Sequence, residues 1–303
     1  MKVTLWGVRG SVPVPGPATV RYGGNTPCIE VVGASGEYII LDVGTGAHAL
    51  GRDLLSRPPL PSPIHLFISH THWDHIQGFP FFAPCYVPGV TVHVRGPVHF
   101  HQHRQLRDVF DQQMQFEFFP ISNSQLAATI TYESLAETSL SVGSLTVTTQ
   151  FMNHSVQCLG YRICEQNRTM VYTGDHEPYY NVFVDGADPL DDPLVGDAGA
   201  MVDRATERFL SFLSGADLVI IDCQYTPTEY PVKKRTWGHS SWDYCLTWMQ
   251  QAAVRCMVLT HHDPLRSDDA LDAMTQDIHR AAAERGIDPD MVLIAREGME
   301  LSL

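Results

Sequence analysis

The stretch His70-Thr71-His72-Trp73-Asp74-His75 places three imidazoles and a carboxylate within six residues. It directly follows residues 64–69, an apolar run that predicts a buried strand, so we expect it on the loop that leaves this strand. Imidazole and carboxylate ligands together suit divalent metals such as zinc, iron or manganese. His70 and His72 alternate along the stretch and can face one ion, while Asp74 and His75 turn towards a second. A chance His-rich loop is the alternative, but four potential ligands in six residues favour a metal site.

The composition is that of an acidic globular chain. Its 303 residues are 44% hydrophobic, and 34 Asp and Glu against 20 Lys and Arg give a formal net charge of −14. The length would allow two domains, but single α/β domains of this size are common, so we expect one domain over residues 1–303. The negative field repels phosphate backbones, which disfavours a long nucleic acid as partner. A small anion could still bind where metal ions reverse the charge locally.

The cysteines and the first residues indicate the compartment. Seven cysteines are scattered along the chain and form no Cys-x-x-Cys pair. This favours a reducing compartment over a disulfide framework. The beginning of the chain lacks the apolar core of a signal peptide, and no apolar run approaches the ~18 residues of a membrane span. We therefore expect a cytoplasmic protein that does not enter a membrane.

Short apolar segments rich in β-branched residues predict strands along the whole chain. They lie at 29–32, 38–41, 64–69, 90–94, 145–150, 159–163, 169–173, 218–221, 257–260 and 291–294. Helices are expected at 45–56, 103–116, 200–214, 240–253 and 267–285. This order favours an α/β fold of two mixed sheets with helices outside them over one doubly wound parallel sheet. The Pro-, Asp- and Gly-rich residues 185–199 predict a surface loop within the domain.

Residues 95–120 are expected to form a helical and aromatic insertion. Their beginning contains His99, His101 and His103, and their end is Phe116-Glu117-Phe118-Phe119-Pro120. Alternating histidines could bind a metal, but a polar loop entering a helix is the favoured interpretation. The aromatic residues could be a pocket wall, a lid, a dimer contact or ordinary core.

Three further candidate ligands each follow a predicted strand. His154 follows residues 145–152, Asp175 comes directly after Gly174, and His261 follows residues 257–260. Gly174 permits a tight turn. Strand ends converge at one edge of a sheet, where α/β folds usually place their sites. Each residue alone is a weak signal, but together with residues 70–75, here called the metal loop, they form a pattern.

This series resembles the motifs of the metallo-β-lactamase fold over nearly the whole chain. The resemblance implies a four-layer αββα sandwich, and the turn Leu41-Asp42-Val43-Gly44-Thr45-Gly46 is similar to the family's turn that supports the metal loop without binding metal. Asp175 in place of Cys resembles the branch that hydrolyses phosphodiesters or thioesters. The implied ligands are His70, His72 and His154 for one ion, Asp74, His75 and His261 for the other, and Asp175 as the bridge.

Gly238-His239-Ser240-Ser241 is similar to the His-Ser-Thr loop of ribonuclease Z and its small-molecule phosphodiesterase relatives. In those relatives the histidine lies by the scissile phosphate and assists the leaving oxygen. The resemblance therefore makes His239 a catalytic residue, together with the ligand Asp74. His239 could instead simply begin a helix, and Ser240 or Ser241 could also cap that helix.

Several neighbouring residues allow two interpretations. Asp222 resembles an acidic residue that supports the His239 loop, or it serves a structural turn. The family aligns the first histidine after the threonine, which favours His261, while His262 would line the pocket or bond Asp263. The segments 6–11 and 22–26 also resemble the phosphodiesterase branch. Residues in them, Arg9 or Asn25, could reach the substrate, although glycine-rich hairpin turns are the favoured explanation of the segments.

The resemblance thus implies a dinuclear metal-dependent phosphodiesterase that hydrolyses a small phosphodiester, plausibly a cyclic nucleotide, by attack of a metal-bridging hydroxide. Zinc is the first choice of metal, and manganese or iron also fit. Two ions bring four positive charges, of which Asp74, Asp175 and a hydroxide cancel three. A local charge of about +1 would attract a phosphodiester. A homodimer is expected from the relatives.

Three other functions remain open. A ribonuclease Z-type tRNA 3′ endonuclease would carry a basic, glycine-rich arm, but the only basic run here is Lys233-Lys234-Arg235. This run beside His239 could bind substrate phosphate or be a solvated loop. The His239 motif argues against a thioester hydrolase, and nothing outside the ligand set supports a non-enzymatic di-iron sensor.

Overall fold

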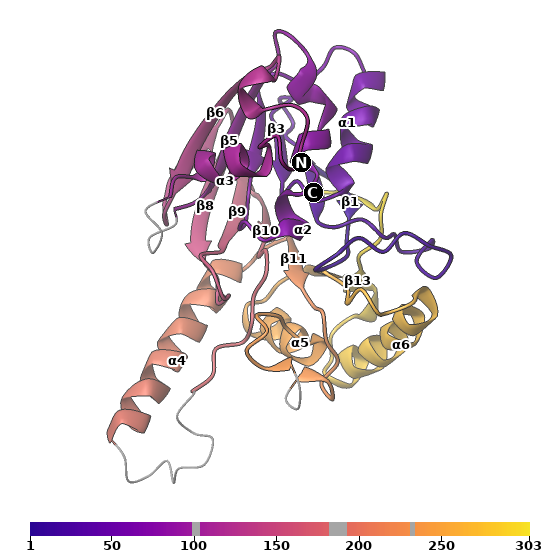
Figure 1. The fold of residues 1–303 in the computed structure, drawn as a ribbon. Helices are drawn as coiled ribbons and strands as arrows, with labels where there is room; N and C mark the ends of the chain where they lie inside the picture. The colour runs from indigo at the N-terminus through magenta and orange to yellow at the C-terminus, as the bar shows by residue number, and fades with distance from the viewer. Residues whose placement is uncertain (99–103, 182–192, 231–233) are drawn as a thin grey trace.

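The structure is a computed structural model that describes residues 1–98, 104–181, 193–230 and 234–303. In this part of the chain two mixed seven-stranded sheets pack face to face (Figure 1). Their shared core contains apolar residues of both sheets, among them Leu5, Leu41, Tyr161 and Ile220. The expectation of two mixed sheets rather than one doubly wound sheet is confirmed.

The first sheet is built mainly by the first half of the chain. In sheet order its strands are β14 (Glu300–Ser302), β1 (Lys2–Gly7), β2 (Cys28–Val32), β3 (Tyr38–Leu41), β4 (Ile64–Phe67), β5 (Thr91–Pro97) and β6 (Thr129–Leu135). Neighbours from β14 to β3 pair antiparallel, and neighbours from β3 to β6 pair parallel. The carboxyl ends of β3 and β4 therefore lie at the same edge.

The second sheet is built by residues 139–294. In sheet order its strands are β13 (Val292–Ile294), β12 (Cys256–Thr260), β11 (Leu218–Asp222), β10 (Arg168–Tyr172), β9 (Leu159–Glu165), β8 (Leu145–Phe151) and β7 (Ser139–Val142). Strands β10 to β13 pair parallel, and β7 to β10 pair antiparallel. Residues that follow β10, β11 and β12 consequently meet at one edge of this sheet.

Helices cover the outer faces of both sheets. α1 (Gly46–Ser56) and α3 (Leu106–Gln113) pack on the first sheet, and α5 (Trp242–Gln251), α6 (Asp268–Glu284) and the end of α4 (Pro193–Leu213) pack on the second. The short α2 (Trp73–Ile76) carries the end of the metal loop. In Figure 1, α4 extends away from the body of the molecule. This is the expected αββα sandwich. Among the described residues, no helix combines the length and apolarity that crossing a bilayer would require.

All predicted strands are present, but the sequence analysis missed β1, β6, β7 and β14. β6 and β7 pair on one side only and expose many of their residues, so they lack a long apolar signal. β14 has only three residues. These strands widen the sheets without changing which strand ends meet at the site.

Two predictions about irregular segments need correction. Residues 193–199 belong to α4, so the loop expected over 185–199 is wrong there, and 185–192 lie outside the described residues. A proline suits the first turn of a helix because the missing N–H has no helical acceptor there, so Pro193 begins α4 and does not indicate a loop.

The segment 95–120 is also less separate than expected. Residues 95–97 belong to β5, where Arg95 pairs with Glu133, and α3 is shorter than the predicted helix. His99, His101 and His103 lie outside the described residues. Phe119 packs against Phe81, with ring centroids 5.3 Å apart, whereas the side chains of residues 116 and 118 are exposed. The aromatic residues therefore do not form one cluster.

Candidate metal centre

The metal loop is anchored by Asp42, a buried carboxylate at the end of β3. Its Oδ1 accepts the Ser69 N–H at 2.6 Å, and its Oδ2 lies 2.8 Å from His75 Nδ1. The Tyr172 hydroxyl, from the other sheet, donates to Oδ2 at 2.6 Å. Asp42 is in none of the groups of potential ligands, so it supports the metal loop as the resemblance implied.

Four side chains from three strand ends form the first group of potential ligands: His70, His72, His154 and Asp175. The Nδ1 of His72 lies 3.0 Å from His70 Nε2 and 3.2 Å from His154 Nε2. Asp175 Oδ2 lies 3.5 Å from His70 Nε2 and 3.8 Å from His154 Nε2. The structure thus brings together the residues that the sequence analysis assigned to one ion.

The second group consists of Asp74, His75, His261 and again Asp175. His75 and His261 face each other with Nε2 atoms 3.3 Å apart, and Asp74 Oδ2 lies 3.1 Å from His261 Nε2. Asp175 Oδ1 lies 3.3 Å from both of these Nε2 atoms. One carboxylate oxygen of Asp175 therefore faces each group, which is the arrangement of a bridging ligand.

The spacing of these atoms fits bound divalent ions. Ligand atoms that surround one ion at ~2.0–2.2 Å lie ~3.0–3.5 Å from one another. The closest ring nitrogens in both groups lie 3.0–3.3 Å apart, and all four ligand atoms of each group lie within 4.8 Å. Asp175 Oδ1 is buried and accepts no hydrogen bond from the described residues. The side chains present can therefore hold two ions that share Asp175.

Burial and neighbouring charges favour the metal-binding form of several ligands but not of His75. Burial lowers the pKa of His154 to about 4, and burial together with His75 lowers the pKa of His70 well below its usual value. Burial raises the pKa of Asp175, but His261, His75 and His70 outweigh it and hold this pKa well below its usual value. Neutral imidazole and ionised carboxylate are the forms that ligate metals. Burial lowers the pKa of His75, but Asp175, Asp74 and Asp42 outweigh it and raise this pKa well above its usual value, so a metal ion would displace a proton there.

His239 lies beside these groups and is paired with Asp222 at the end of β11. Its Nδ1 is 2.9 Å from Asp222 Oδ2, and its ring stacks on His261 with centroids 4.8 Å apart. These three residues and Asp175 form a third close group of possible ligands, but the hydrogen bond makes His239 and Asp222 a pair. The Nε2 of His239 has no hydrogen-bond partner within the described residues. Asp222 thus supports the His239 loop, as its resemblance implied.

The loop of residues 236–241, here called the His239 loop, is also held by Glu177. One carboxylate oxygen accepts the Thr236 N–H at 2.6 Å and the Tyr230 hydroxyl at 3.0 Å, and the other accepts the Gly238 N–H at 3.0 Å. The sequence analysis did not single out Glu177. Its partners lie 53 to 61 residues further along the chain, so no local pattern reveals them.

A glycine packs against one imidazole of each group. A Cβ on Gly238 would lie 2.3 Å from His154 Nδ1, and one on Gly10 would lie 2.4 Å from His261 Nδ1. Gly238 has φ +86°, which other residues rarely adopt, and its carbonyl lies 2.9 Å from His154 Nδ1. Next to Gly10, the Ser11 N–H donates to Asp74 Oδ2 at 2.7 Å. Both glycines therefore help to position ligands.

Arg9 does not face the metal centre. Its side chain is fully buried, and its guanidinium donates to the carbonyls of Gly23 at 2.8 Å and Arg266 at 2.6 Å. The interpretation of Arg9 as a substrate contact is therefore wrong. Asn25 is tied to Glu297, which accepts from its side-chain amide at 3.1 Å. These contacts hold the turns that contain Arg9 and Asn25.

Contacts also decide two further alternatives: which of His261 and His262 faces the ligand groups, and whether Ser241 caps α5. His262 points away from the ligand groups, with Nε2 2.8 Å from the Ala295 carbonyl. Ser241 occupies the N-cap position of α5, but its hydroxyl donates to Asp243 at 2.6 Å and does not cap the helix. Lys234 Nζ lies 4.0 Å from the ring centroid of the exposed Trp237, and Lys233 lies outside the described residues, so both interpretations of this basic run stay open.

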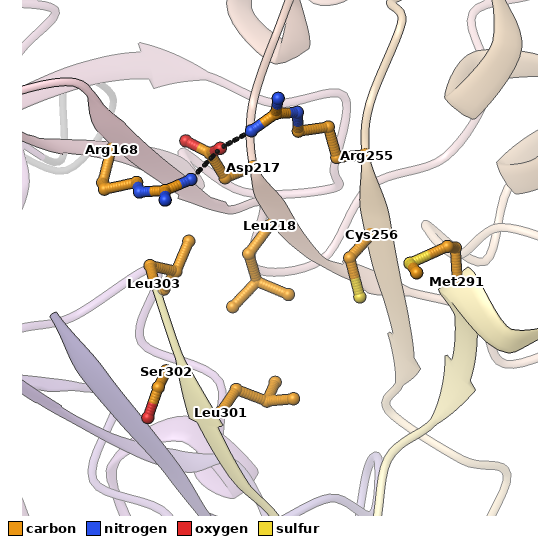
Figure 2. A pocket seen from close by; sticks show the side chains of 9 residues that line it. All are labelled: Arg168, Asp217, Leu218, Arg255, Cys256, Met291, Leu301, Ser302 and Leu303. Atoms are coloured by element: carbon orange, nitrogen blue, oxygen red, sulfur yellow. Dashed lines mark hydrogen bonds and ion pairs between the residues drawn. The ribbon is translucent and has the colours of Figure 1, made fainter.

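A pocket of about 500 Å³ lies at the opposite ends of the parallel strands (Figure 2). Arg168, Leu218 and Cys256, which begin β10, β11 and β12, line it. Arg168 and Arg255 both donate to Asp217 Oδ1, with N–O distances of 3.1 and 2.7 Å. It contains no group of potential metal ligands among the described residues, so it is separate from the candidate metal centre.

Comparisons with known proteins agree with this geometry. The profile of the Beta-lactamase superfamily domain matches residues 38–188. A ribonuclease Z from Lactococcus lactis subsp. lactis (strain IL1403) is 25% identical over 225 residues, covering 65% of this chain and 69% of that protein.

Two solved structures resemble the fold over almost the full length of both chains. The metallo-β-lactamase fold protein YhfI from Bacillus subtilis has 19% identity and a TM-score of 0.64, with 99% of this chain and 98% of the other covered. A diphosphatase from the PhnP family has 15% identity and a TM-score of 0.62, with 100% and 97% covered. At these identities the two structures show a shared fold.

Proposed function

We propose that this chain is a hydrolase of the metallo-β-lactamase superfamily, namely a dinuclear metal-dependent phosphodiesterase acting on a small phosphodiester, such as a cyclic nucleotide. The observation that carries the proposal is the pair of His239 and Asp222 beside two groups of ligands that share Asp175. This arrangement supplies both an anion site and a proton donor next to it.

In this proposal His70, His72 and His154 hold one ion and Asp74, His75 and His261 hold the other, with Asp175 between them. Zinc is the first choice for a His/Asp set of this kind, and manganese or iron would also bind. Two such ions supply a polarised water and positive charge for the phosphate oxygens. Because only two of the seven ligands are anionic, the site remains cationic within an acidic chain.

His239 assists departure of the leaving oxygen. Asp222 occupies its Nδ1, which orients the ring and leaves Nε2 as the atom that can donate a proton. The ring stacks on His261, so a substrate held at the ligands lies within its reach. A positioned general acid of this kind typically contributes ~10²–10⁴-fold to the rate.

A ribonuclease Z-type tRNA endonuclease is the second candidate, because a ribonuclease Z is among the relatives. The net charge of −14 argues against it, since a tRNA precursor carries many phosphates that such a field repels. Lys234, in the only basic run of the sequence, packs on the rings of Tyr225 and Trp237. A small diester is therefore preferred.

A substrate panel on protein loaded with a defined metal tests the proposal. The panel compares 3′,5′- and 2′,3′-cyclic nucleotides, an aryl phosphodiester, a thioester and a tRNA precursor. We expect small diesters to have the highest kcat/KM. Faster cleavage of the tRNA precursor would favour the endonuclease, and hydrolysis of the thioester alone would favour a thioester hydrolase. A metallated protein that hydrolyses nothing in the panel would refute the proposed activity.

A further inference from the structure

A cavity of about 400 Å³ opens beside the metal centre on the side of His154. His154 and Gly238 belong both to the metal centre and to the cavity wall. The cavity is lined by residues of four segments, 153–155, 177–180, 201–205 and 236–238. The cavity therefore adjoins the metal centre across His154 and Gly238.

The walls of the cavity suit a flat, largely apolar group. Tyr179 and Tyr180 contribute aromatic rings from the segment after Asp175, and α4 contributes Val202 and Ala205. Binding cavities of ~300–1,000 Å³ with aromatic and apolar walls are typical of small-molecule sites. Ser155 is exposed at the rim of the cavity, where its hydroxyl offers a polar contact. The cavity therefore combines aromatic surface with a few polar groups.

The walls are held in place without a ligand. Glu177 binds the backbone of Thr236 and Gly238, which fixes one wall to the segment that carries Tyr179. Tyr179 packs edge-on against His176, with ring centroids 5.5 Å apart, and the Arg235 guanidinium lies 4.5 Å from the Tyr180 ring centroid. A preformed wall lowers the entropy cost of binding a ligand.

We propose that this cavity binds the nucleobase of a nucleoside phosphate whose phosphate lies at the metal centre. The inference rests on the proposed function, because the metal centre must bind the phosphate. Contact of a base with aromatic side chains is worth on the order of 10- to 100-fold in affinity. The cavity would thus select nucleotide diesters over simple alkyl diesters.

Calorimetric titration of metal-loaded protein with adenosine 5′-monophosphate and with inorganic phosphate tests this inference. We expect the nucleotide to bind at least 10-fold more tightly than phosphate. Ala205→Phe, which fills the cavity from α4, should remove this difference and leave phosphate affinity unchanged. Ala200→Phe adds the same ring at an exposed position of the same helix and should retain the difference.

Equal binding of nucleotide and phosphate to the unmodified protein would overturn the inference, as would a full preference for the nucleotide in Ala205→Phe. If that variant does not fold, Ala205→Leu should reduce the preference to an intermediate value, and an unchanged preference would count against the cavity. The assay needs no turnover. Tight nucleotide binding by a protein that hydrolyses no diester would refute the proposed function while supporting the subsite.

Discussion

The metal loop and the His239 loop lie against the same cluster but have different supports and different tasks. Asp42 anchors the metal loop through Ser69 and His75, and this loop supplies four of the candidate ligands. Asp222 and Glu177 hold the His239 loop, which supplies one imidazole paired outside the first two ligand groups. In the proposed mechanism, metal binding and proton donation rest on separate carboxylates. One function can therefore be removed without the other.

The largest effect should come from Asp175, which both ligand groups share. In Asp175→Ala we expect loss of both ions and hydrolysis reduced to background, because each ion loses a ligand and the bridge between them disappears. Metal content by mass spectrometry and turnover of an aryl phosphodiester measure this. Asp203→Ala, an exposed carboxylate on α4, is the control. Two ions retained in Asp175→Ala would contradict the bridging assignment.

The next largest effect should come from the His239 loop alone. His239→Ala should lower kcat by ~10²–10⁴ and retain both ions, because it removes the proton donor but no member of the first two groups. The exposed His48→Ala serves as the matched control. Unchanged turnover, or loss of metal together with activity, would show that His239 does not have the assigned role.

Weakening the support of the metal loop should affect metal affinity first. Asp42→Asn retains the size of the side chain but replaces one oxygen that contacts His75 and Tyr172. We expect metal affinity to fall ~10–100-fold, as is typical when a partner of a metal ligand is changed. Titration against a competing chelator measures the affinity. Activity at saturating metal should largely recover, and failure to recover would mean that Asp42 does more than hold the loop.

The smallest effect should follow weakening of the other support. In the unmodified protein the Glu177 carboxylate accepts the backbone N–H groups of residues 236 and 238, and Glu177→Gln replaces one of these acceptor oxygens by an NH2 group. The His239 loop should shift, so we expect kcat to fall about 10-fold with metal affinity unchanged. The same chelator titration supplies the comparison. A loss of metal affinity as large as that of Asp42→Asn would erase the proposed separation of the two loops.

Local sequence was sufficient for the parts of the site that follow strands directly. The metal loop, Asp175 and His261 could be predicted because each comes just after an apolar segment, and parallel strand ends share an edge. The support that Glu177 gives to the His239 loop and the packing of Gly10 on His261 could not be predicted, because the partners come from distant parts of the chain. The partners of Arg9 could not be predicted for the same reason: its acceptors include the carbonyl of residue 266, which no local pattern connects to it.

The sequence by itself determined the class of the fold, the residues available as ligands and the acidic charge that disfavours a long polyanion. Those properties depend on residue type and on spacing along the chain. The tertiary structure alone decided that Glu177 holds the His239 loop, that Gly10 packs against His261, and that the Arg9 guanidinium binds backbone carbonyls away from the metal centre. These choices depend on side-chain direction and on contacts between the two sheets, which form only when distant segments pack together.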